Sequence, residues 1–145
     1  MKYQVEVGLD LPRKRVIDLF DSFENLKKWQ PGLKSVEHMN GEVGHPGAKS
    51  KLFYDMNGRK IEMIETIIER DLPDVFSGTY DAKGVHNIVE NRFIEDGADK
   101  TRWVIDTEFQ FSGLMKLMGF FMKGAFPKQT LDNMNNFKTF AESAQ

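Results

Sequence analysis

The chain has 145 residues, and this length predicts a single domain over residues 1–145 with a core of its own. It contains no cysteine, which excludes disulfides, thiol nucleophiles and cysteine-based zinc sites and fits a reducing, cytoplasmic location. With 20 basic and 22 acidic residues the net charge is −2, so no nucleic-acid partner is expected.

The N-terminal third predicts one strand followed by two short helices. Residues 2–9 alternate polar and apolar side chains, as a half-buried strand does and as the continuous apolar run of a signal peptide does not. A helix is expected to begin at Pro12, because proline is favoured in a first turn and apolar residues then recur at helical spacing. A second helix, residues 25–29, is expected to stop at Pro31 and Gly32.

Strand and turn signals then alternate along the middle of the chain. Six strands are predicted, at residues 33–42, 48–56, 60–70, 75–80, 85–94 and 101–111. Consecutive strands with short connections pair antiparallel, and such a sheet needs an apolar cover on one side. The only element large enough is a long helix over residues 114–141, which would span roughly 42 Å. The gap beneath it is either packed solid or a cavity.

Three segments in this order resemble a known superfamily over essentially the whole chain. They are VIDLFDSFENLKKWQPGLKSVE, GADKTRWVIDTEF and FPKQTLDNMNNFKTFAE. The chain resembles the START-like (SRPBCC, birch-pollen-allergen-like) superfamily, and within it the small polyketide cyclase/dehydrase members. The resemblance implies an α+β helix-grip fold, in which a seven-stranded curved antiparallel sheet, built as one strand, two short helices and six strands, wraps on a long C-terminal helix. It also implies a hydrophobic or amphipathic small molecule as partner.

The two-residue period of the strands indicates which side chains face the gap. In residues 101–111 Trp103 points inward, and in residues 85–94 Asn87 and Asn91 share the inward side with valines. A buried amide without a partner costs about 1–3 kcal/mol, so the two amides either bond to neighbours or trapped water, or orient the polar end of a ligand. The expected lining of a cavity is Trp29, Tyr54, Tyr80, Asn87, Asn91, Trp103, Met118 and Phe121.

Candidate catalytic groups are few. Residues 60–70 are apolar on both sides, so Glu65 is either a buried acid, acting with Tyr80 as a general acid/base, or an exposed carboxylate at the sheet edge, which we favour. The three histidines are isolated in sequence, so neither a metal nor a cofactor is expected. The glycine-rich segment GEVGHPG lacks the features of a phosphate loop and is interpreted as a long hairpin connection.

The most unusual segment is residues 114–126, which is apolar nearly all round, with a kink expected at Pro127. Three roles stay open for it: ordinary core, a movable gate of the cavity, or a dimer or membrane-docking patch flanked by Lys116 and Lys123. An apolar stripe is expected at Leu117, Phe121, Phe126, Leu131, Met134, Phe137 and Ala141. Because no apolar run has the length of a membrane span, membrane contact should be transient at most, and the protein a monomer or homodimer.

Three functions follow from these patterns. The first is binding, with transport as an extension, of a hydrophobic or amphipathic small molecule. The second is a cyclase, aromatase or dehydratase-like enzyme that uses the tyrosines, Glu65 or the amides to polarise a ketone or move a proton. The third is a chaperone-activator-like interaction module, which would have a filled core. An open cavity distinguishes the first two from the third.

Overall fold

The computed structural model describes residues 1–144 and has the predicted order of elements. The chain begins with β1 (Lys2–Leu9), α1 (Arg13–Phe20) and α2 (Phe23–Trp29). The middle consists of β2 (Leu33–Asn40), β3 (Lys49–Met56), β4 (Arg59–Asp71), β5 (Val75–Ala82), β6 (Val85–Glu95) and β7 (Thr101–Phe111). The last two elements are α3 (Met115–Phe121) and α4 (Ala125–Ser143).

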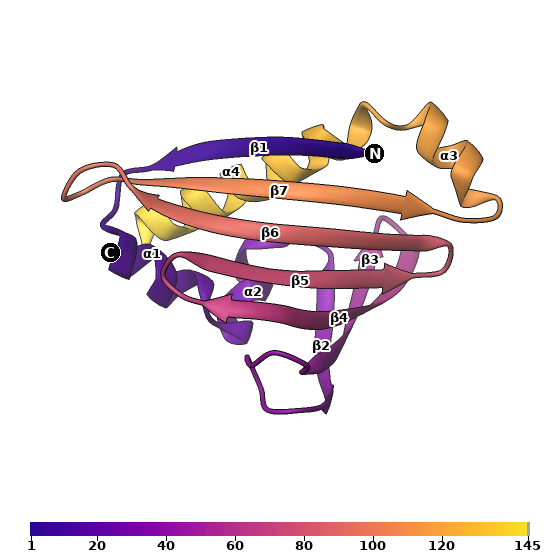
Figure 1. Ribbon diagram of the computed structural model, residues 1–145, viewed down its shortest axis with the longest axis horizontal. Coiled ribbons are helices and arrows are strands. Elements are labelled where there is room, and N and C mark those ends of the chain that lie inside the picture. The colour runs from indigo at the N-terminus through magenta and orange to yellow at the C-terminus, as the bar shows by residue number, and fades with distance from the viewer. Residues whose placement is uncertain (145) are drawn as a thin grey trace.

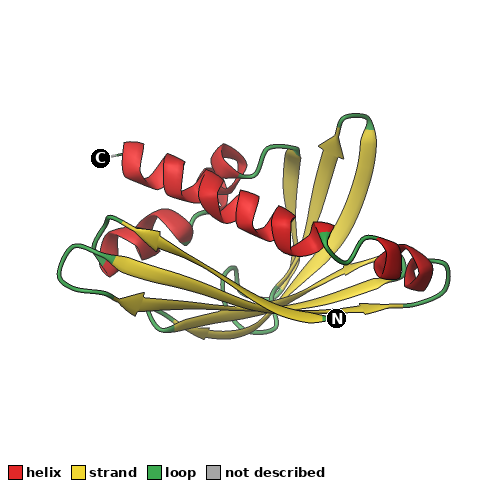
Figure 2. Cartoon of the chain, turned by 90° about the horizontal axis from the view of Figure 1, so that it is seen from above, coloured by secondary structure: helices red, strands yellow, loops and turns green. Residues whose placement is uncertain are grey.

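The strands form one curved antiparallel sheet in the order β1-β7-β6-β5-β4-β3-β2. Each strand from β2 to β6 pairs with the next one in sequence, and β1 pairs with β7 along its whole length. Figures 1 and 2 show α4 crossing the concave side of this sheet, with the β2–β3 end bending up beside it. The helix-grip fold that the sequence predicted is thereby confirmed.

The first strand holds the last helix in position. The hydroxyls of Tyr3 on β1 and Thr130 on α4 are hydrogen-bonded at 2.7 Å. Further along the same pair of elements, the ammonium group of Lys138 donates to the carbonyl oxygen of Gly8 at 2.6 Å. These contacts fix the direction of α4 along the edge of the sheet.

The packed core lies at one end of the gap between helix and sheet. The C-terminal half of α4 buries Met134, Phe137 and Ala141 there, each at most 1% exposed. Phe20 of α1 is surrounded by the rings of Trp29, Phe76, Phe93, Trp103 and Phe137, with centroids 5.0–6.3 Å away. A second, smaller group of rings, Phe109, Phe111 and Phe126, packs where β7 ends and α4 begins.

The inward directions predicted for β6 and β7 are confirmed. Trp103, Ile105 and Thr107 are buried, whereas Arg102 beside them is exposed. Phe93 of β6 stacks on Trp103, with the ring planes 14° apart and the centroids 5.8 Å apart. The period-two pattern was sufficient here because neither strand is interrupted by a bulge in their pairing.

The prediction of one continuous C-terminal helix is wrong. The helix is interrupted at residues 122–124, so α3 and α4 are separate. Pro127, where a kink was expected, is instead the third residue of α4. A proline is tolerated there because backbone N–H groups in the first turn have no intrahelical acceptor to lose.

Replacing Trp103 by Ala should destabilise the fold by about 3–5 kcal/mol, the usual cost of deleting a buried tryptophan side chain. Trp103 is 1% exposed, and its indole N–H donates to the Oδ1 atom of Asn91 at 3.0 Å. Trp103→Phe is the matched variant, because it keeps a ring but leaves the Asn91 acceptor unpaired, at a cost of about 1–3 kcal/mol. Urea denaturation measures both, and a loss below about 0.5 kcal/mol for Trp103→Ala would contradict its place in the core.

Candidate functional site

A cavity of about 1350 Å³ opens between the concave side of the sheet and the helices α2, α3 and α4. Its wall on the sheet comes from the inward side chains of β3 to β7, and its roof from α4. Drug-sized ligands usually occupy pockets of about 300–1,000 Å³, so the space suffices for a small molecule. The gap that the sequence left undecided is therefore not packed solid.

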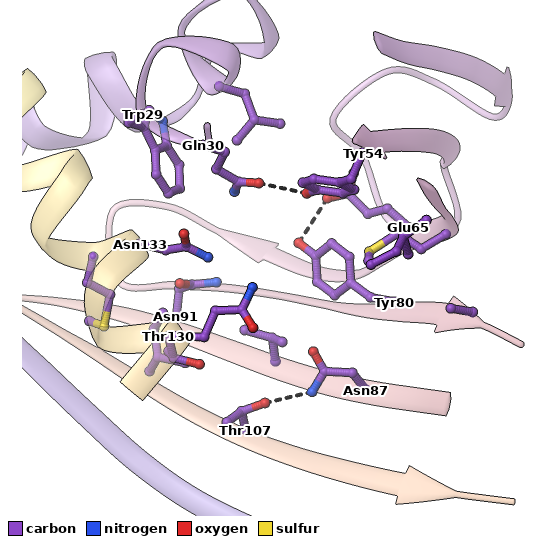
Figure 3. Close-up of a pocket in the computed structure, with 18 of the residues that line it drawn as sticks. Trp29, Gln30, Tyr54, Glu65, Tyr80, Asn87, Asn91, Thr107, Thr130 and Asn133 are labelled. Atoms are coloured by element: carbon purple, nitrogen blue, oxygen red, sulfur yellow. Dashed lines mark hydrogen bonds between the residues drawn. The ribbon is translucent and has the colours of Figure 1, made fainter. Parts of the chain in front are cut away.

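Two tyrosines and a glutamate form a polar cluster on the β3–β5 wall (Figure 3). Glu65 of β4 and Tyr80 of β5 are direct partners across neighbouring strands, and the Tyr80 hydroxyl donates to the Oε2 atom of Glu65 at 2.9 Å. Tyr54 of β3 donates in turn to the side-chain oxygen of Gln30, which follows α2, at 2.6 Å. The cluster thus joins three strands to the end of α2 around one side of the cavity.

Burial decides the protonation of this cluster. It raises the pKa of the Glu65 carboxyl, and the hydrogen bond from Tyr80 opposes that rise only in part. Burial also raises the pKa of Tyr54 and of Tyr80, and the nearby Glu65 carboxylate raises both further. The two tyrosines are therefore neutral hydroxyl donors at physiological pH, and the carboxyl favours its neutral form more than an exposed glutamate does.

The favoured expectation that Glu65 is an exposed edge carboxylate is wrong. Its side chain is buried, at 8% exposure, on the cavity side of β4. The pairing of β4 with β5 shifts register between Ile67 and Glu69, and the extra residue, Ile68, is 54% exposed. This bulge lies after Glu65 and leaves its phase unchanged. The sequence was ambiguous because Ile64 and Ile68 give the outward side of the strand an apolar character as well.

The two amides on β6 have different environments. Asn91 is 6% exposed; its Oδ1 atom accepts from Trp103 and its Nδ2 atom donates to the carbonyl oxygen of Phe76 at 3.2 Å. Asn87 donates from Nδ2 to the Thr107 hydroxyl at 2.7 Å and to the Glu108 carbonyl at 3.0 Å. Figure 3 shows the oxygen of Asn87 on the side away from Thr107. Asn91 is therefore a structural amide, whereas Asn87 keeps an acceptor beside the cavity.

Sequence reasoning missed several polar residues of the wall. Gln30 comes from the end of α2, Thr107 from β7, and Thr130 and Asn133 from α4. The spacing of Thr130 and Asn133 could have revealed them. Residues 126, 130, 133 and 137 follow one another at intervals of three and four, which places them on one side of a helix. The signal for Gln30 was weaker, since only the position of α2 brings it to Tyr54.

Trp29 lies beside the cavity as predicted, with one unusual feature. It is 5% exposed, and its indole N–H is buried without a hydrogen-bond acceptor in residues 1–144. A buried donor in this state costs about 1–3 kcal/mol. Trp29 also contacts Trp103 edge to face at 6.1 Å, so both tryptophans of the chain report on this region.

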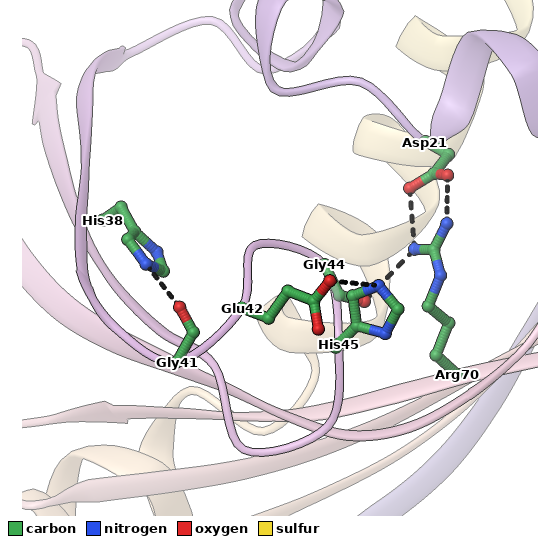
Figure 4. A network of polar contacts seen from close by, with 7 residues as sticks. All are labelled: Asp21, His38, Gly41, Glu42, Gly44, His45 and Arg70. Atoms are coloured by element: carbon green, nitrogen blue, oxygen red, sulfur yellow. Dashed lines mark hydrogen bonds and ion pairs between the residues drawn. The ribbon is translucent and has the colours of Figure 1, made fainter.

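On one rim of the cavity an arginine holds two loops together by hydrogen bonds (Figure 4). The guanidinium of Arg70 on β4 donates to both carboxylate oxygens of Asp21, at 3.0 and 2.5 Å, and to the carbonyl oxygen of Gly44 at 3.3 Å. These bonds tie the α1–α2 junction to the glycine-rich segment. Gly41 in that segment has a φ of +80°, and a Cβ there would approach Ala48 Cα to 2.8 Å. The segment is the hairpin connection between β2 and β3 that the sequence predicted, and Arg70 holds it in place.

The histidines do not meet in the structure. His38 bonds to the carbonyl oxygen of Gly41 at 2.7 Å, His45 lies 3.6 Å from Glu42, and His86 contacts Asp81. Within residues 1–144 no group of three or more His, Cys, Asp or Glu side chains is arranged to hold a metal ion.

The other rim is formed by α3, and here a predicted lining residue lies outside. Met115, Met118 and Met122 border the cavity, but Phe121 is 74% exposed and does not. The break at residues 122–124 reorients α3, so its side chains no longer continue the stripe of α4. Leu117 was expected on that stripe and is exposed because α3 is reoriented. Leu131 was also expected on it and is exposed because its side chain lies on the outer side of α4. The outer side of α3 is therefore not part of the core. That α3 moves as a gate of the cavity stays a prediction.

Comparison with known proteins agrees with this architecture. The family model described as polyketide cyclase / dehydrase and lipid transport matches residues 1–142. The chain matches no curated protein. Its structure is similar to the Zhui aromatase/cyclase from Streptomyces sp. R1128, with a TM-score of 0.81 and 15% identity over 98% of this chain and 93% of that one.

Two further solved structures are similar at comparable identity. Ara h 8.0201 gives a TM-score of 0.76 and 14% identity over 99% of this chain and 98% of that one. A protein from Thermus thermophilus gives 0.79 and 15% identity over 100% and 99%. At these identities the likeness establishes the fold and leaves the ligand open.

The raised pKa of Glu65 predicts a pH-dependent stability. The folded chain holds the Glu65 proton more tightly than the unfolded chain, so stability is greatest below the ordinary glutamate pKa of about 4.3 and is lost as pH rises toward the raised value. Relative to Glu65→Gln, the wild-type free energy of unfolding should therefore fall between pH 4 and pH 8. The fall should be about 1.4 kcal/mol for each unit by which the pKa of the carboxyl is higher in the folded chain than in the unfolded chain.

Urea denaturation of both proteins across this range makes the measurement. Glu69→Gln, which changes an exposed carboxylate of the same strand, is the matched control and should stay parallel to wild type. If Glu65→Gln is parallel to wild type as well, then burial does not raise the pKa of the carboxyl and the proposed protonation is wrong.

Proposed function

The chain belongs to the polyketide cyclase / dehydrase and lipid transport family, and from that premise we propose that it binds a hydrophobic or amphipathic small molecule between the sheet and α4. The observation that carries the proposal is the cavity of about 1350 Å³ itself. An interaction module would need no such space, so the cavity favours a ligand over that alternative. Apolar side chains such as Phe76, Val89 and Ile105 supply much of the wall, which suits a ligand with an apolar body.

The polar groups of the wall support an amphipathic ligand rather than a pure hydrocarbon. They are Glu65 with its tyrosines on the sheet, Asn87 with Thr107 beside them, and Asn133 on α4 opposite (Figure 3). A buried polar group is retained at a cost unless it is hydrogen-bonded. A hydroxyl or carbonyl partway along the ligand would meet both donors and acceptors here. A ligand carboxylate would be disfavoured beside Glu65 whenever that residue is ionised.

The cavity predicts that filling it abolishes binding. Val89 lies on the β6 wall, so Val89→Trp should occupy the ligand volume, whereas Ile68→Trp adds the same ring at an exposed position of β4. We expect wild type and Ile68→Trp to bind the neutral fluorescent probe N-phenyl-1-naphthylamine, with quenching of their tryptophan emission. Val89→Trp should bind about tenfold or more weakly, a difference of about 1.4 kcal/mol.

Native mass spectrometry of the three proteins purified from the original host then identifies what the cavity carries. A small molecule retained by wild type and Ile68→Trp, and missing from Val89→Trp, is the expected result. Equal probe binding by all three proteins, with no retained molecule, would mean that the cavity is not the binding site.

A second candidate function is proton transfer on the bound molecule, favoured by the Glu65–Tyr80 pair. A carboxyl with a raised pKa is suited to general acid/base chemistry near neutral pH, and a neutral tyrosine beside it can hydrogen-bond a ketone oxygen. Incubating wild type and Glu65→Gln in D₂O with a ketone found among the molecules that wild type retains tests this. Deuterium at the carbon next to the carbonyl with wild type alone supports catalysis, and equal incorporation in both, at the rate without protein, leaves binding as the only function.

A further inference from the structure

The outer side of α3 and the residue before it is an exposed apolar surface, which we call the α3 patch. It consists of Leu114, Leu117, Phe120 and Phe121, which are 89%, 61%, 67% and 74% exposed. The two phenylalanine rings pack edge to face, with centroids 5.6 Å apart. Single exposed apolar side chains are ordinary on a protein surface, but four large ones within eight residues mark an interaction site.

The protein holds this patch outward by packing the opposite side of α3 on the sheet. Gly119 is buried against the ring of Phe111, and a Cβ there would lie 2.6 Å from Cδ2 of that ring. Met115 packs equally closely on Gly84 in the β5–β6 turn, where an added Cβ would lie 2.6 Å from Cγ of the methionine. Since the methionine side of the helix is occupied by the sheet and the cavity, the leucines and phenylalanines are left facing solvent.

The surroundings of the patch are basic. No acidic residue occurs between Phe109 and Leu131, whereas Lys116 and Lys123 lie within that stretch and form no ion pair in residues 1–144. The ammonium group of Lys123 is 5.7 Å from the centroid of the Phe120 ring. Cations therefore flank the apolar patch in a chain whose net charge is −2.

Further cations border the same cavity on the β3–β4 and β5–β6 sides. Arg59, Lys60 and Lys83 line it, and none of them has an ion-pair partner among the described residues. The carboxylates close in sequence are engaged: Glu62 pairs with Lys51, Asp81 with His86, and Asp55 accepts from the backbone N–H of Gly58. The cationic side chains around this rim are thus available to an external anion.

We propose that the α3 patch and these cations form a docking surface for the anionic face of a lipid bilayer. Leucine and phenylalanine side chains enter the boundary between headgroups and acyl chains, and lysines beside them contact anionic headgroups. Among residues 1–144 no helix combines the length and the apolar character of a membrane span. Docking itself needs no ligand. Met115, Met118 and Met122 lie on α3 beside the patch and border the cavity, so a ligand could pass there between the cavity and the bilayer. This exchange rests on the proposed function.

A second copy of the chain fits this surface less well. A two-fold contact through α3 would bring the unpaired Lys116 and Lys123 of both copies together, and residues 109–131 contain no carboxylate to receive them. The apolar area of one seven-residue helix is also small beside the roughly 800 Å² that each partner contributes to a standard interface. An anionic bilayer supplies both the missing counter-charge and an extended apolar phase.

Co-sedimentation with vesicles tests the proposal, using phosphatidylcholine alone and an equal mixture with phosphatidylglycerol. Wild type should sediment with the mixed vesicles, less so at high salt, and remain in solution with the neutral ones. Phe120→Ser/Phe121→Ser and Lys116→Glu/Lys123→Glu should each weaken sedimentation about tenfold or more.

Two controls separate the patch from general effects. Lys14→Glu/Lys100→Glu makes the same change in net charge in α1 and in the β6–β7 connection, which lie at the end of the sheet away from α3 (Figure 1). Ile68→Ser removes an exposed apolar residue from β4. Both should sediment like wild type. The proposal is overturned if wild type ignores anionic vesicles, if the patch variants bind as wild type does, or if the patch drives self-association in analytical ultracentrifugation instead.

Sedimentation with vesicles should not depend on whether the cavity binds a ligand. The Phe120→Ser/Phe121→Ser protein should keep its affinity for N-phenyl-1-naphthylamine, because neither ring lines the cavity. Val89→Trp, with the cavity filled, should still sediment with anionic vesicles. Failure of ligand binding and failure of docking therefore appear in different variants.

Discussion

The packing of aromatic rings around Phe20 is the interaction on which the rest of this structure depends. It gathers α1, α2, α4 and three strands at one end of the sheet, with centroid separations of 5.0–6.3 Å from Phe20. Because the core is close-packed there, α4 is fixed by its C-terminal half. The sheet continues beyond that cluster, and the cavity opens beside it, with Phe20, Trp29 and Trp103 on its wall. The same rings therefore belong to the packed core and to the lining of the cavity.

The polar wall of the cavity differs from this core in how its polar groups are held. A carboxyl group such as that of Glu65 is costly in a close-packed core, where it must be paired or neutral. In the cavity wall it is bonded to Tyr80 and remains beside open space, so its neutral form is favoured without an ion-pair partner. Asn91, in contrast, lies at the junction with the core and has its amide satisfied by Trp103 and the backbone. Two polar residues on the inward side of the sheet therefore have different roles according to their distance from the aromatic cluster.

The break between α3 and α4 gives the cavity a rim with two chemically different sides. One side of α3 presents methionines to the cavity, and its adaptable side chains suit ligands of varied shape. The other side presents leucines and phenylalanines to solvent. Gly119 makes this division feasible, because only a residue without a side chain allows the helix to approach Phe111 so closely.

The sequence by itself determined the order of the elements, the antiparallel pairing and the inward sides of β6 and β7, because turn signals and the two-residue period depend only on neighbouring residues. It also placed Trp29, Tyr54, Tyr80, Asn87, Asn91, Trp103 and Met118 beside the cavity. Tertiary structure alone decided which side of β4 faces the cavity, and with it the burial of Glu65, and it decided the exposure of Phe121, which depends on where α3 docks on the sheet. Gln30 reaches Tyr54 only because α2 ends above β3. In each of these cases the deciding contact joins different helices or strands, about which local periodicity carries no information.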